Sequence, residues 1–229
     1  MVKKIYAIIP ARGGSKRIKK KNIIEIGGKP MIAWTIQAAL ETDLIDKVIV
    51  STDCPEIAKV AKKYGAEVPF LRNDKADDIS TVSEATIACI KQINENKIEF
   101  PEIVVQLMAN CPLRTRKDIE SSLNHFIKHK YDFQLSCFKY GWMNPWWAHK
   151  MEGDKIEPLF PNALKTRSQD LPNLYCPTGA IWIAKTKSLI NSGTFYGKSY
   201  KFFELDWISS VDIDDYDDLK MAEYCLKYI

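Results

Sequence analysis

The sequence predicts an α/β protein built on a doubly wound, mainly parallel sheet. Short apolar runs alternate with stretches of helical length and pattern along most of the chain. The chain has 229 residues, enough to bury the core of one large domain. Its composition, with 46% hydrophobic and 27% charged residues, is that of an ordinary globular protein.

The apolar runs are expected to form the strands of the sheet. They are short, and most are rich in β-branched and aromatic residues, as strands usually are. The first is apolar throughout residues 5–9, which suits a buried strand. In chain order, the expected strands are residues 4–9, 47–52, 67–70, 103–107, 133–138, 179–184 and 201–205.

The intervening stretches are expected to form helices, and several carry recognisable end signals. Pro30 is expected in the first turn of the first helix, and Gly65 stands where glycine commonly ends one. Thr115 and Asp118 have the spacing of a capping box. The expected helices are residues 30–40, 55–64, 81–93, 115–128 and 215–226. This alternation of strand and helix favours parallel strand pairing.

The alternation stops between residues 139 and 177, and we expect an insertion there within one domain spanning residues 1–229. The insertion contains Trp142, Trp146 and Trp147 together with several turn signals. Aromatic side chains of this kind are typical both of ligand pockets and of dimer interfaces. The sequence leaves these two interpretations of the tryptophans open.

Composition also excludes several classes of protein. The six cysteines are spread without a CxxC pair, so neither a disulfide framework nor a zinc site is expected. No apolar run is long enough to span a bilayer, and the N-terminus lacks the pattern of a signal peptide, so a cytoplasmic protein is expected. A net charge of only +4 argues against a nucleic-acid-binding protein.

One segment is far more basic than the rest of the chain. Residues 10–22 read PARGGSKRIKKKN, with six basic side chains and two glycines directly after the first expected strand. Ligands of parallel sheets bind at the carboxyl ends of strands, and glycines let backbone N–H groups approach an anion. The loop matches neither the GxGxxG nor the GxxxxGK[ST] pattern. It is therefore expected to hold a polyphosphate by another arrangement, with a solvated basic loop as the alternative.

An acidic segment near the other end of the chain is a candidate metal site. Residues 212–218 read DIDDYDD, and Asp212 and Asp214 project to one side if the chain there is extended. Two carboxylates on one side suit Mg²⁺, whose coordination phosphate and water would complete. The alternative is a solvated turn. Asp215 is expected to cap the last helix, with Asp218 in its first turn.

Taken together, these motifs resemble the CMP-sugar synthetases, the cytidylyltransferases that activate sialic and related nonulosonic acids. The matching stretches are IIPARGGSKRIKKKN, GGKP, VIVSTD, CPLRT, PTGAIWI and SVDID, in the order and spacing of that family. The resemblance covers nearly the whole chain. It implies a Rossmann-like nucleotidyltransferase core and a cytoplasmic homodimer in which residues 139–177 reach toward the partner's active site. It also implies that CTP and a nine-carbon acidic sugar give a CMP-sugar and pyrophosphate, with Mg²⁺ as cofactor, in the biosynthesis of cell-surface glycans.

The resemblance also assigns roles to individual residues. The catalytic residues would be Arg12, Lys21, Asp212 and Asp214, of which the two aspartates would bind the metal. The residues that bind CTP would be Arg12, Gly13, Gly14, Ser15, Lys16, Lys21, Asn22, Arg72 and Asp78. The residues near the sugar would be Met108, Arg167 and Thr178.

Two of these positions depart from the sialic acid enzymes. Met108 stands where those enzymes usually have glutamine, and Thr178 where they have asparagine. The stretches GSKRI, EVPFLR and TRSQDL resemble the pseudaminic acid enzymes more closely. The sugar therefore stays open among the sialic, legionaminic and pseudaminic types. The alternatives are the same reaction on another acidic sugar such as Kdo, a metal-dependent glycosyltransferase, or an inactive nucleotide-binding dimer.

Overall fold

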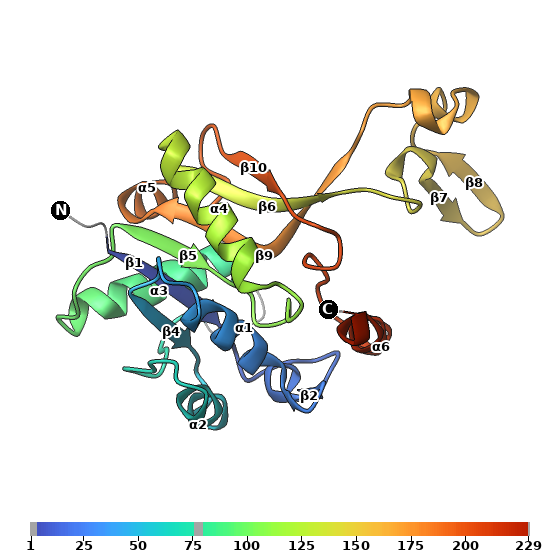
Figure 1. Cartoon of the computed structure of the whole chain (residues 1–229). Helices are drawn as coiled ribbons and strands as arrows, with labels where there is room; N and C mark the ends of the chain where they lie inside the picture. Colours follow the sequence, from blue (N-terminus) through green and yellow to red (C-terminus); the bar gives the residue numbers. More distant parts are fainter. Residues whose placement is uncertain (1–3, 76–79, 229) are drawn as a thin grey trace.

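The structure is a computed structural model that describes residues 4–75 and 80–228. Its centre is a six-stranded sheet in the order β10-β6-β9-β5-β1-β4 (Figure 1). The strands are β1 (Ile5–Pro10), β4 (Lys47–Ser51), β5 (Ile103–Gln106), β6 (Phe133–Lys139), β9 (Tyr175–Lys185) and β10 (Lys201–Glu204). β1 is parallel to β4 and β5, and β6 is parallel to β10. β9 runs antiparallel to both of its neighbours, so the sheet is mainly but not wholly parallel, as expected.

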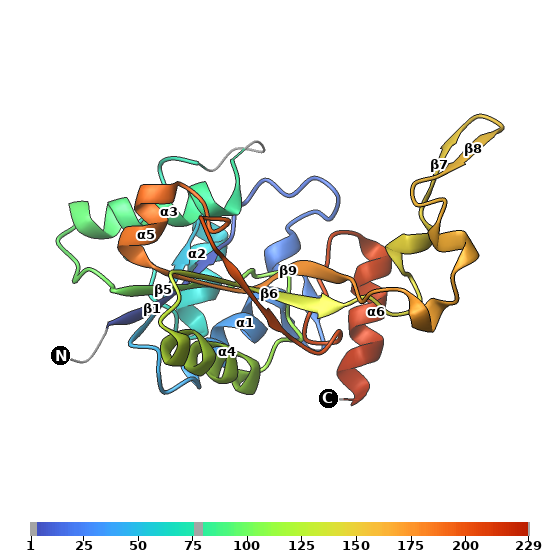
Figure 2. The same ribbon diagram turned by 90° about the horizontal axis from the view of Figure 1, so that it is seen from above.

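Helices cover both faces of this sheet, which confirms the doubly wound arrangement (Figure 2). One face is packed by α1 (Met31–Leu40), α2 (Pro55–Lys63) and α4 (Arg116–His129). The other is packed by α3 (Val82–Glu95) and α5 (Thr186–Ser192). A sixth helix, α6 (Tyr216–Cys225), lies beyond the strand ends (Figure 1).

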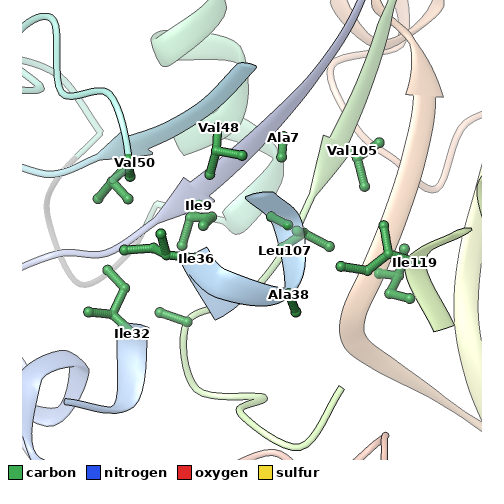
Figure 3. Close-up of a cluster of buried hydrophobic side chains, with 14 of the residues drawn as sticks. Ala7, Ile9, Ile32, Ile36, Ala38, Val48, Val50, Val105, Leu107 and Ile119 are labelled. Atoms are coloured by element: carbon green, nitrogen blue, oxygen red, sulfur yellow. The ribbon is translucent and has the colours of Figure 1, made fainter. Parts of the chain in front are cut away.

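Alternate residues of β1 supply the two faces of the core. Ala7 and Ile9 pack on the side of α1, where Ile36 approaches Ile9 (Figure 3). Ile8 packs on the side of α3. Both faces are apolar because a parallel strand is covered by helices on both sides. The β1 strand is thus fixed in the middle of the molecule, and its carboxyl end has a defined position.

Most of the expected helix ends are confirmed. The Thr115 and Asp118 side chains form a reciprocal capping box at the start of α4. Asp215 caps α6, with Asp218 in its first turn. Gly65 follows α2 with a φ of +94°, a conformation that favours glycine. Pro30 lies one position earlier than expected, at the N-cap of α1 rather than inside it.

One expected element is absent, and two observed elements were not expected. Residues 67–70 do not form a strand, because only Glu67 bridges to Ile49, and Pro69 has no N–H to extend the ladder. The helix α5 was not expected, since its seven residues are too few for a clear periodic pattern. The short hairpin of β2 (Glu25–Ile26) and β3 (Lys29–Pro30) was also missed.

The segment expected as an insertion contains a hairpin that stands away from the main sheet in both views (Figures 1 and 2). The hairpin is made of β7 (His149–Glu152) and β8 (Lys155–Pro158). β6 extends to the first residue of the expected insertion, and β9 begins before its end, so the two strands connect the hairpin to the sheet. Short 3-10 turns complete the structure: η1 (Lys21–Ile23), η2 (Pro145–Trp147), η3 (Ala163–Lys165), η4 (Ser168–Asp170) and η5 (Leu226–Tyr228).

All six cysteines are free, as expected. Within residues 4–75 and 80–228, none of the helices combines the length and the apolar character that a membrane span requires.

Candidate active site

A pocket of about 550 Å³ opens where β1 and β5 end. Six basic side chains contribute to its lining: Arg12, Lys16, Arg17, Lys21, Arg72 and Lys75. Asp214 is the acidic residue in the lining. This concentration of positive charge suits a ligand with several negative charges, such as a polyphosphate.

The basic loop is held in shape by bonds to its neighbours. The Ala11 N–H donates to the carbonyl oxygen of Ser51, at 2.9 Å, as the loop leaves β1. The buried Asn22 side chain donates from Nδ2 to the carbonyl oxygen of Arg12, also at 2.9 Å. Asn22 therefore lines the pocket and also ties the end of the loop to its beginning.

The two glycines of the loop have different surroundings. A Cβ atom at Gly13 would lie 2.9 Å from Cβ of Cys54, closer than such atoms normally approach, so this position requires glycine. The Gly13 N–H donates to Oδ1 of Asp53 at 2.9 Å, so a carboxylate of the protein already engages this amide. A Cβ at Gly14 would have open space around it. Neither glycine contributes to the lining of the pocket, although both belong to the loop that forms its wall.

Lys21 and Asp214 form the central ion pair of the site. Nζ of Lys21 lies 2.9 Å from Oδ1 of Asp214 and also donates to the carbonyl oxygen of Ile213 at 3.0 Å. Arg17 holds the other carboxylate oxygen of Asp214, with Nη2 at 2.7 Å. Burial alone would raise the pKa of Asp214, but the hydrogen bonds and charges of Lys21 and Arg17 outweigh it and lower that pKa.

Asp212 lies in a different electrostatic environment two residues earlier. Burial, followed by the negative charge of Asp214, raises the pKa of Asp212 to about 6. Asp212 keeps a solvent-exposed surface, yet protein atoms surround its carboxylate closely enough to remove much of its hydration. The Asn110 side chain donates from Nδ2 to Oδ1 of Asp212, and the Asn110 carbonyl oxygen accepts from the N–H of Ile213 at 2.9 Å. Asn110 thus holds this segment against the end of β5.

An apolar cluster joins the basic loop to the acidic segment. Ile18 of the loop is fully buried and belongs to one cluster with Ile213 and with Leu219 of α6. Burying these side chains stabilises the contact by roughly 1.5–3 kcal/mol for each one. In residues 211–214, apolar and acidic residues alternate. The apolar side chains anchor the segment in the cluster, and the acidic ones remain outside it.

The two aspartates fit a hard divalent cation. Their oxygens are the ligands that Mg²⁺ prefers, and a cation between them would offset the negative charge of Asp214 that raises the pKa of Asp212. In the part of the chain that the structure describes, no group of three or more His, Cys, Asp or Glu side chains could hold a metal. A cation at Asp212 and Asp214 would therefore need further oxygens from a phosphate ligand and water.

The remaining predicted site residues are placed in different ways. Arg72 and Met108 line the pocket, together with Ser15 of the loop. Arg72 is buried, which lowers the pKa of its guanidinium, and its Nη1 donates to the carbonyl oxygen of Ser51 at 3.2 Å. Asp78 lies outside the residues that the structure describes.

Thr178 and Arg167 do not line the pocket of this single chain. Thr178 is buried within the fold, where its hydroxyl donates to the carbonyl oxygen of Ser210 at 3.1 Å. Arg167 lies in the expected insertion, exposed and paired with Asp170 at 2.7 Å. Its predicted role near the sugar is therefore not reproduced at this pocket.

Sequence reasoning missed two groups of residues at the site. Asn110 was not singled out, although it stands just after β5, where ligand-binding residues of α/β proteins occur. Lys75, Ser80 and Thr81 also line the pocket, next to the start of α3. The capping-box spacing of Thr81 and Glu84 marks that helix end in the sequence and could have drawn attention to it.

Comparison with known proteins gives a consistent result. A family profile described as cytidylyltransferase matches residues 6–201. A pseudaminic acid cytidylyltransferase of Campylobacter jejuni is 32% identical over 226 residues, which cover 98% of this chain and 97% of that protein. A CMP-N,N'-diacetyllegionaminic acid synthase of Legionella pneumophila is 34% identical over 225 residues, which cover 96% of this chain and 95% of that protein.

The fold also matches a solved structure. A CMP:2-keto-3-deoxy-manno-octonic acid synthetase complexed with CTP superposes with a TM-score of 0.72, covering 98% of this chain and 99% of that one. The two sequences are 17% identical, so this likeness supports the fold alone.

Proposed function

The chain belongs to the cytidylyltransferase family, and on that premise we propose that it transfers CMP from CTP to a nonulosonic acid and releases pyrophosphate. The relatives that share about a third of its sequence along nearly its full length are named for pseudaminic and diacetyllegionaminic acid. The same reaction on Kdo is the alternative, which rests on a likeness of fold at 17% identity. Family membership favours nucleotide transfer over the glycosyltransferase interpretation of residues 212–214.

The observation that carries this proposal is the cationic pocket at the end of β1, closed by the pairing of Lys21 with Asp214. In the proposed reaction the anomeric hydroxyl of the sugar attacks the α-phosphorus of CTP, and the bond from that phosphorus to pyrophosphate breaks. Such transfers depend on alignment and charge neutralisation more than on covalent help from the protein. The basic side chains that line the pocket would neutralise the charge of the phosphates, and their arrangement around one cavity would align them.

Individual residues would divide this work. Arg12, Ser15 and Lys16 of the loop would bind the triphosphate by charge and hydrogen bonding. Lys21, held by the carbonyl oxygen of Ile213, would take up negative charge that develops on the phosphate oxygens. Arg72 would lie by the base, and Met108 would bound the sugar.

Asp212 and Asp214 would hold Mg²⁺. The ion would supply charge neutralisation at the phosphates and polarise the attacking hydroxyl. The protein's part is to keep the two carboxylates in place, which Asn110 does for Asp212 and the pair of Arg17 and Lys21 does for Asp214.

We propose that the protein acts as a homodimer, with the hairpin of β7 and β8 at the contact. Met151 and Ile156 of the hairpin are exposed, as are Trp142, Met143 and Leu159 in the flanking parts of residues 139–177. An apolar surface of this kind is typical of an interface. Dimerisation would let Arg167 of one chain approach the pocket of the other. We also propose that the reaction takes place in the cytoplasm, where CTP is available as a substrate.

Pyrophosphate release tests this function directly. The purified protein is incubated with CTP, Mg²⁺ and one sugar at a time from a panel of N-acetylneuraminate, legionaminate, pseudaminate and Kdo. Release with one of the first three supports the proposal, whereas release with Kdo alone supports the alternative. A chain that binds CTP without turnover of any sugar would contradict the transferase proposal for this panel.

A matched pair of variants links the activity to the pocket. Lys21→Ala removes a cation from the lining, whereas Lys19→Ala removes an exposed one from the same loop, outside the lining. The first should abolish release and the second should preserve it. If both variants lost activity equally, the net charge of the loop would matter rather than the position of Lys21 in the pocket.

A further inference from the structure

Asp53 ends the stretch VIVSTD, two residues after β4, and its side chain contacts the basic loop. Its Oδ1 accepts the N–H of Gly13 at 2.9 Å. The Ala11 N–H also donates to the carbonyl oxygen of Ser51 at 2.9 Å. Residues 51–53 therefore hold the loop by two hydrogen bonds, one at Ala11 and one at Gly13. The carboxylate is partly buried between these segments.

The backbone at Gly13 lies so close to Cys54 that it leaves no room for a side chain. A Cβ on Gly13 would lie 2.9 Å from Cβ of Cys54 and 3.8 Å from Oδ2 of Asp53. The first distance is too short for any side chain at this position without movement of the loop or of the turn after β4. The contact between Gly13 and Asp53 therefore depends on the absence of a side chain at Gly13.

The same short segment also holds Arg72, which forms another part of the pocket wall. The Arg72 N–H donates to the carbonyl oxygen of Thr52 at 2.7 Å, and its Nη1 donates to the carbonyl oxygen of Ser51. The negative charge of Asp53 favours the charged form of the Arg72 guanidinium, against the effect of burial. Residues 51–53 thus fix two walls of the pocket relative to each other.

Asp53 is not itself placed to contact the nucleotide. It does not contribute to the lining of the pocket, whereas Arg72 and the cations of the loop do. Asp53 therefore acts on the pocket through the residues that it holds. We propose that Asp53 is a positioning residue, whose carboxylate holds Gly13 so that the cations of the loop are set to receive the triphosphate.

This inference rests on the proposed function for its kinetic consequence. Asp53→Asn keeps a side-chain oxygen that can accept from Gly13, whereas Asp53→Ala removes it. Asp53→Ala should raise KM for CTP about tenfold, with smaller changes in kcat and in KM for the sugar. Asp53→Asn should stay within about threefold of the wild type. An asparagine variant as impaired as the alanine variant would overturn the inference, because the charge rather than the hydrogen bond would then matter.

A second variant tests the same contact from the other side. Gly13→Ala should raise KM for CTP similarly, because the new Cβ cannot occupy the position close to Cys54. In the double variant with Asp53→Ala the two effects should not add, since both break one contact. Additive effects would overturn the inference.

Amide hydrogen exchange of the nucleotide-free protein supplies a readout that does not need turnover. Asp53→Ala should speed exchange in a peptide covering residues 11–18 at least tenfold, whereas Asp53→Asn should leave it close to the wild-type rate. Unchanged exchange in Asp53→Ala would contradict the positioning role even if catalysis were lost. If Asp53→Ala sped exchange but the wild type transferred CMP to none of the sugars, the contact would be supported and the proposed function refuted.

Discussion

Replacing Asp212 by asparagine should stabilise the protein in the absence of metal. Burial and the charge of Asp214 raise the pKa of Asp212 from its ordinary value of 3.8 to about 6, so the ionised carboxylate is disfavoured in the folded state. Asparagine has nearly the same shape and keeps an oxygen that can accept from Asn110. The substitution thus removes the charge with little change in packing.

The size of the effect follows from the pKa shift. A shift of this extent corresponds to roughly 3 kcal/mol if it is realised in full. Asp212 keeps an exposed surface, and solvent screening reduces the cost, so we expect a gain of about 1 kcal/mol. For a chain of this length that gain would raise Tm by about 2–4 °C.

The size of the gain depends on pH, whereas its sign does not. A carboxyl group whose pKa is raised on folding binds its proton more tightly in the folded state than in the unfolded chain. The cost of ionising Asp212 is therefore present in full above about pH 6 and vanishes as the pH approaches 4. Urea unfolding of wild type and Asp212→Asn at pH 8 and at pH 4.5 measures this difference.

Asp217→Asn is a suitable control, because the Asp217 side chain is 92% exposed. Its effect should stay within about 0.5 kcal/mol at both pH values. If Asp212→Asn were no more stable than the wild type at pH 8, or gained equally at pH 4.5, the account of Asp212 would be refuted. Addition of Mg²⁺ and CTP should reverse the order, since the wild type alone keeps both proposed metal ligands.

Three other predictions concern the pocket and its surroundings. Lys21→Ala should lower kcat at least a hundredfold, with Arg17 still pairing Asp214, and normal release of pyrophosphate would exclude a catalytic role. Gly179→Ala should lower the free energy of unfolding in urea by about 1–3 kcal/mol, because its Cβ would meet Sδ of Met108. Met108→Ala in the same chain should restore much of this stability. If it restored none, the loss would have another cause. EDTA should stop pyrophosphate release without lowering Tm, and Mg²⁺ should restore it; turnover that continues in EDTA would contradict the metal proposal.

The elements that the sequence predicted well carry local signals. The helix α4 has a capping threonine and an apolar stripe, and β1 is a run of apolar residues before a glycine-bearing loop. The position of the basic loop beside a pocket was also predictable, because carboxyl ends of parallel strands are binding positions. Each of these inferences needs only neighbouring residues and one general rule.

The features that were missed depend on contacts between distant residues. The hydrogen bond from Asn110 to Asp212 joins positions 102 residues apart, and nothing in the sequence around either residue indicates that the two are partners. The antiparallel direction of β9 is likewise absent from its own sequence, since an apolar strand reads alike in either direction. The role of Gly13 follows from Cys54, the N-cap residue of α2, whose Cβ leaves no room for a side chain at position 13.

The basic loop and the acidic segment stand 192 positions apart at the pair of Lys21 with Ile213. A ribosome adds about 5–20 residues per second, so roughly 10–40 s of translation separate the two halves of the site. During that time the nascent chain carries the loop but neither the carboxylates nor the α6 side chains that bury Ile18. The completed pocket is therefore a late product of synthesis.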